Sequence, residues 1–187
     1  MKSKKQLKIR KNLFGLYAFI VLMIALTVVP IFDANAQTTT HGNLTFMATQ
    51  EAIANAPELS HLLFDINPSA LIAEDGVGHH NLPSEEVAPI IAFCAPTAFK
   101  TLYAKSNEVN LTKVKAIAIT LTNNQEISEL NLMNLKDFDE LEYVSFTFTY
   151  DVCGGAKNSS CLLPIVQNMV KPGNTPLTIL YQLSIPE

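Results

Sequence analysis

The spacing of apolar residues changes several times along the chain after residue 37. In 114–122 (VKAIAITLT) and 142–152 (EYVSFTFTYDV), every second position is apolar, which is typical of a strand with one buried face. Between these segments, apolar residues from Ile127 to Phe138 recur at the spacing of a helix face. We therefore predict strands over 59–66, 114–122, 142–152 and 176–185, helices over 49–56, 84–103 (in pieces), 127–138 and 162–170, and a long loop over 67–86.

Helical segments between strands favour crossover connections and a parallel sheet, so the sequence predicts an α/β fold. Residues 37–187 are long enough for one domain with its own core, and no Gly/Ser-rich or Pro-rich linker divides them. A single compact α+β domain accounts for the same pattern, and both architectures stay open at this point.

One motif recurs among the predicted strands. Residues 59–67 (LSHLLFDIN) fit the template L-x-x-L-x-L-x-x-N, and its first three positions recur at 114–119 and at 141–146. The last two segments begin 27 residues apart, and a missing unit and a last unit would begin near 87 and 177. These segments resemble leucine-rich repeats, whose periods run about 20–29 residues. The resemblance implies a short solenoid of helix–strand units in which the strands at 59–66, 114–121 and 142–148 are parallel neighbours in one sheet. Stacking at a fixed period would then place Leu62, Ile117 and Val144 in one inner row, and Phe64, Ile119 and Phe146 in the next.

Repeat proteins bind their ligands on the open strand face of the stack. The resemblance therefore implies a binding face at the outward positions between the apolar ones. Small hydroxyl groups beside a tyrosine suit polar contacts with a protein or a glycan. The outward positions are His61, Asp65, Ala118, Thr120, Tyr143, Ser145 and Thr147.

The first 36 residues have the pattern of a secretory signal peptide. Six basic residues lie within 1–12, an apolar run follows over 13–32, and Ala34-Asn35-Ala36 provides a cleavage site before Gln37. The competing interpretation is an uncleaved membrane anchor, because about 20 apolar residues can span a bilayer. We predict cleavage, an oxidising destination in a bacterium (periplasm or exterior), and no membrane association afterwards.

Removal of the signal changes the charge. Residues 1–36 contain six of the 13 basic residues and one of the 17 acids, so residues 37–187 have 7 Lys, no Arg, 16 acids and a net charge of −9. Such a surface is repelled by phosphate backbones and lacks the forked donor that grips them, so we exclude nucleic acid as a partner. High solubility accounts for the charge without a specific cationic ligand.

Two of the three cysteines bracket a short turn-rich loop. In an exported protein, Cys153 and Cys161 around GGAKNSS are expected to form a disulfide, and the alternative is two free thiols. Cys94 lies among apolar neighbours (APIIAFCAPTAF), so we predict a buried, inert thiol.

The segment 74–94 is the one candidate for chemistry. His79, His80, Glu85 and Glu86 are residue types that bind zinc or copper, but their spacing matches no metal motif. A periplasmic hydrolase or metal-dependent enzyme using this segment is the alternative function. Since no nucleophile, phosphate-loop or dinucleotide signature occurs, we predict a non-enzymatic binding or protein-interaction module with no catalytic residue, metal or cofactor.

The exported protein is expected to begin at Gln37. Mass analysis of the protein from the culture medium or periplasm should give a chain without residues 1–36, with a cyclised or free terminal glutamine. Recovery of residues 13–32 in a membrane fraction would replace export with anchoring.

Overall fold

The structure is a computed structural model, and it describes residues 38–65, 70–74, 77–81, 88–99, 102, 110–135, 137–155 and 159–185. The predicted signal peptide and its cleavage site at Ala36 and Gln37 lie outside these residues. Residues 36–187 form one compact unit.

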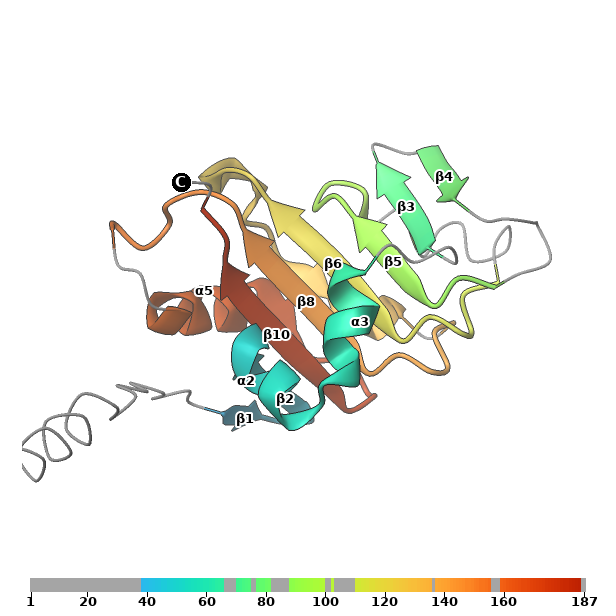
Figure 1. Cartoon of the computed structure of the whole chain (residues 1–187), viewed down its shortest axis with the longest axis horizontal. Coiled ribbons are helices and arrows are strands. Elements are labelled where there is room, and N and C mark those ends of the chain that lie inside the picture. The colour runs from blue at the N-terminus through green and yellow to red at the C-terminus, as the bar shows by residue number, and fades with distance from the viewer. Residues whose placement is uncertain are drawn as a thin grey trace, which may run out of the picture. The chain divides into compact units, whose positions relative to one another are not determined.

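One sheet of eight strands organises this unit (Figure 1). Its six inner strands are parallel and its two edge strands are antiparallel to their neighbours, so the predicted α/β fold with a mostly parallel sheet is confirmed. A single compact domain is equally compatible with this sheet. In spatial order the strands are β1 (Thr39–His41), β2 (Leu44–Ala48), β10 (Leu177–Leu183), β8 (Tyr143–Phe148), β6 (Ala116–Leu121), β5 (Ile91–Cys94), β3 (Ala70–Glu74) and β4 (Val77–Asn81).

The helices are short and lie on both faces of the sheet (Figure 1). On one face are α2 (Thr49–Asn55) and α3 (Glu58–Phe64), and α5 (Leu162–Met169) packs into the core of the other. A second, two-stranded sheet pairs β7 (Leu130–Asn131) with β9 (Val170–Lys171). Three single turns of 3₁₀-helix are η1 (Asn124–Glu126), η2 (Leu132–Asn134) and η3 (Ser159–Cys161).

The main core is built from rows of side chains that cross the sheet in register. Ile117 lies opposite Val144, and Ile119 lies opposite Phe146, as predicted. The first row continues through Leu71, Ala92, Ile179 and Phe46, and the second through Ala73, Cys94 and Tyr181. All of these side chains are buried in the main core.

The connections on the two faces run in opposite directions. From β5 through β6 and β8 to β10, each strand adds beside the last, and the buried residues of the connections belong to the main core. The α2–α3 connection returns from β2 to β3 across the other face, where Leu59 and Leu63 pack on a smaller core. The α2–α3 connection runs across the sheet in the opposite direction and on the opposite face from the other connections. The two reversals cancel, so all these crossovers have the same hand, as parallel units in one sheet normally do.

The predicted strand at 59–66 is wrong, because this segment is helix α3. Leu59 and Leu63 are four residues apart and buried on one side of the helix, whereas Phe64, which the strand would have buried, is 54% exposed. The segment LSHLLF also fits a helix, because Leu62 and Leu63 follow Leu59 by three and four positions. Leu62 consequently does not share the row of Ile117 and Val144, where Ala92 and Leu71 stand instead.

Four further expectations are corrected. The helix predicted in pieces over 84–103 contains strand β5 instead. The described residues of 127–138 form the short strand β7, the turn η2 and irregular chain instead of the predicted helix. The predicted loop over 67–86 contains the antiparallel pair β3–β4. A template beginning at Leu177 would place Leu180 opposite Val144, but Ile179 aligns with Val144, one residue earlier. A one-residue change of register exchanges the two faces of a strand, so Leu180 is buried under the helices instead.

The predicted disulfide between Cys153 and Cys161 is confirmed, and Cys94 is free and buried. The bridge closes a loop between cysteines eight positions apart, just before α5. A loop of this length restricts the unfolded chain enough to stabilise the fold by about 2–3 kcal/mol. A disulfide is compatible with the predicted export.

A charge placed in the main row should disrupt the sheet. Ile117→Asp buries a carboxylate without a partner among apolar rows and should lower the free energy of unfolding by at least about 3 kcal/mol, measured by urea denaturation. Thr120→Asp is the matched control, since Thr120 is exposed on the same strand and the change should stay within about 0.5 kcal/mol. Equal stability of the two variants would contradict the role of the row.

Candidate functional site

The structure divides the predicted binding face into two parts. Thr120, Tyr143 and Thr147 lie on the sheet face that carries α2 and α3, but α3 crosses this face near the amino ends of the strands (Figure 1). Tyr143 therefore lies at the helix, and the two threonines lie beyond it toward the carboxyl ends. Ser145, predicted to face outward, is only 3% exposed.

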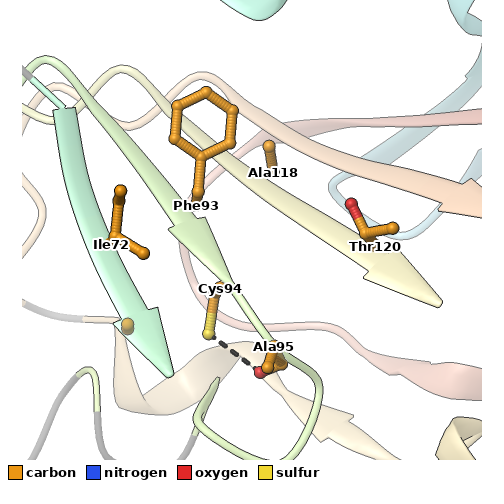
Figure 2. A pocket seen from close by; sticks show the side chains of 7 residues that line it. Ile72, Phe93, Cys94, Ala95, Ala118 and Thr120 are labelled. Carbon is orange, nitrogen blue, oxygen red and sulfur yellow. Dashed lines mark hydrogen bonds between the residues drawn. The ribbon is translucent and has the colours of Figure 1, made fainter. Parts of the chain in front are cut away.

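At the carboxyl ends of β3, β5 and β6 there is a hollow of about 180 Å³. Figure 2 shows Phe93 between Ile72 and Ala118, with Thr120 further along β6. The Thr120 hydroxyl makes no hydrogen bond within the described part of the chain. Further along the same row across the sheet, the Gln182 side-chain amide donates to the Thr147 hydroxyl at 2.9 Å. This hollow is neutral, small and partly polar, and its position is one where parallel sheets often bind ligands.

Cys94 lines the floor of this hollow but is not a nucleophile. Its Sγ donates to the Ala95 carbonyl at 3.1 Å (Figure 2). Burial away from water raises the pKa of the thiol to about 12. At neutral pH the group is therefore a thiol, and it lacks the thiolate that attack on a substrate requires.

A larger groove lies between α3 and the amino ends of the central strands, and we call it the α3 groove. Its volume of about 500 Å³ falls within the usual range for small-ligand sites. Two of the predicted face residues, His61 and Tyr143, line it together. Its lining is half apolar and half charged or polar, and consists of Glu58, Leu59, His61, Leu62, Ile90, Lys115, Glu142 and Tyr143.

Local sequence explains how these side chains come together. Pro57 precedes the first turn of α3, so Glu58 and His61 project from the start and middle of one short helix. Glu142 immediately precedes β8, where Tyr143 begins the strand and its amide donates to the Lys115 carbonyl at 3.1 Å. The groove is therefore formed where a helix from one end of the chain crosses strands from its middle.

Two carboxylates act electrostatically on Tyr143 at one end of the groove. Partial burial raises the pKa of the Tyr143 hydroxyl, and the carboxylates of Glu142 and Glu58 raise it further. Asp65, which follows α3 and was also predicted on the binding face, has its Oδ2 2.7 Å from the Nδ1 of His61. Both side chains are exposed.

The glutamates just before β8 have different surroundings. Glu140 is paired with Lys113, whose hydrogen bond lowers the pKa of that carboxyl, whereas Glu142 lines the α3 groove. Glu58, Leu62, Ile90 and Lys115 also line the groove, and sequence analysis did not select them. No local sequence pattern connects Glu58 with Glu142, because the two residues line one groove only when 58–64 folds as a helix.

The residues of the alternative enzyme hypothesis are only partly placed. His79 and His80 belong to β4, opposite Ile72 and Leu71 of β3, and Glu85 and Glu86 lie outside the described residues. Within the described ranges, no three His, Cys, Asp or Glu side chains are grouped closely enough to hold a metal ion. Over the same ranges, no helix is both long and apolar enough to cross a membrane.

Comparison with protein-family models, curated proteins and solved structures finds no match for this chain.

Cys94 should resist alkylation in the folded protein. A pKa about three units above that of a free thiol makes the thiolate about a thousandfold rarer near pH 8, so iodoacetamide labelling should be slower by at least that factor and become fast in urea. Mass spectrometry measures the labelling, and the bridged pair does not contribute without reductant. Stoichiometric labelling of the folded protein would show that Cys94 is accessible and reactive.

Proposed function

We propose that this protein is an exported, non-enzymatic binding module of the bacterial envelope or exterior, and that its ligand occupies the α3 groove. The observation that carries the proposal is the convergence of Tyr143, apolar side chains and charged groups in one groove of about 500 Å³. Such a mixture of apolar walls and few polar groups is typical of sites that bind rather than cover the core. The export signal pattern and the disulfide support the proposed location.

For the architecture, we propose a short stack related in form to leucine-rich repeats. Support comes from five parallel strands that follow one another in the sheet and begin at Ala70, Ile91, Ala116, Tyr143 and Leu177, which are 21, 25, 27 and 34 residues apart. In this proposal, α2 and α3 cover part of the face that a repeat protein leaves open. The α3 groove is then the remaining opening at the amino ends, and the neutral hollow is the one at the carboxyl ends.

Filling the groove should abolish binding. Chemical-shift mapping of the exported protein with neutral oligosaccharides and with peptides of either charge should perturb the backbone amides of residues 58–62 and 142–143. Leu62→Trp should remove these perturbations because the indole occupies the groove, whereas the control Thr120→Trp fills the hollow on the other side of α3 and should leave them unchanged.

The reverse pattern, with binding lost in Thr120→Trp and retained in Leu62→Trp, would move the site to the carboxyl-end hollow. If none of these probes perturbs a localised set of amides, the proposed binding function is wrong.

A further inference from the structure

We propose that the α3 groove receives a lysine or arginine side chain from a basic segment of a partner protein. This inference rests on the binding function proposed above and specifies its ligand. It uses the charge distribution around Tyr143 together with the apolar walls of the groove.

The two carboxylates of the groove come from distant parts of the chain. Glu58 stands in the first turn of α3 and Glu142 directly before β8, and both act electrostatically on the Tyr143 hydroxyl. Both side chains are exposed, and neither makes an ion pair within the described part of the chain. A cation beside Tyr143 would therefore be attracted by two carboxylates.

The basic groups nearby do not neutralise this end of the groove. Lys115 also lines the groove, but no effect of it on Tyr143 is resolved, whereas it does act on Glu140. Lys113 is paired with Glu140, and His61 is paired with Asp65. The two carboxylates of the groove, Glu58 and Glu142, are thus unpaired among the described residues, and both act on the neutral Tyr143 ring between the helix and the strand.

The groove also suits the rest of a basic side chain. Leu59, Leu62 and Ile90 offer apolar contacts to a methylene stem, and the face of Tyr143 attracts an ammonium or guanidinium group. A volume of about 500 Å³ exceeds what one charged head group fills, so neighbouring residues of a peptide segment would occupy the remainder.

Long-range charge favours the same partner. Residues 37–187 have a net charge of −9 and no arginine, so their field draws a basic protein surface toward the molecule and repels an acidic one. The net charge alone does not determine where a basic partner binds. The groove does, because its unpaired carboxylates lie beside apolar and aromatic surface.

The test uses the exported protein with three probes at low ionic strength: capped pentalysine, capped pentaserine and cadaverine. Pentalysine should perturb the amides of residues 58–62 and 142–143, and calorimetry should show about tenfold weaker binding for Glu58→Gln and for Glu142→Gln. Asp139→Asn removes the same charge from an exposed position outside the groove and should weaken binding by less than about twofold. Tyr143→Phe should retain affinity, and Tyr143→Ser should lose it; amide spectra establish that each variant is folded.

Three results would overturn the inference. Equal weakening by Asp139→Asn would mean attraction by net charge alone, and equal affinity for cadaverine would mean a small amine rather than a peptide segment. Binding of pentaserine or a neutral oligosaccharide in the groove, without pentalysine, would remove the cation specificity while leaving the proposed binding function intact.

Discussion

The in-register pairing of six parallel strands is the constraint on which the rest of the structure depends. Once Ile117 lies opposite Val144, and Ile179 opposite Val144 on the other side, every alternate residue of these strands is assigned to one face. The main core then forms on the face that carries the larger side chains. The connections that contain the disulfide, η2 and α5 cover this face. The opposite face receives smaller residues such as Ala116 and Ala118, which leave room for a helix to lie close.

The position of α3 follows from this division. Its buried Leu59 and Leu63 need apolar surface, and Ala116, Ile91 and Leu180 provide it near the amino ends of the strands. Because α3 has only seven residues, it covers part of the face and leaves an opening on each side. One opening is neutral and carries the Thr120 hydroxyl, and the other has carboxylates beside a tyrosine. The two surfaces are therefore consequences of one short helix on one sheet.

The fold pairs some of the acidic side chains with lysines and leaves others unpaired. Glu140 and Glu129 are each paired with a lysine, whereas Glu58 and Glu142 remain exposed beside apolar walls. Solubility is a sufficient account of the paired and scattered acids. It does not account for two unpaired carboxylates on either side of a groove, which is why the proposed ligand is a cation.

The sequence by itself determined the features that depend on local pattern. Alternation in 114–122 and 142–152 predicted two strands, their common motif predicted that they are parallel neighbours, and the nine-residue span of Cys153 and Cys161 predicted their bridge. It also identified His61 and Tyr143 as binding residues, although on a repeat-like strand face that His61, on a helix, does not share.

Tertiary structure decided between alternatives that the local pattern allows equally. LSHLLF buries leucines equally well as a strand or a helix, and the frame of β10 could place either Ile179 or Leu180 in the main row. Those choices depend on which partner surface each segment covers, and Glu58 meets Glu142 only because α3 packs as a helix across β6.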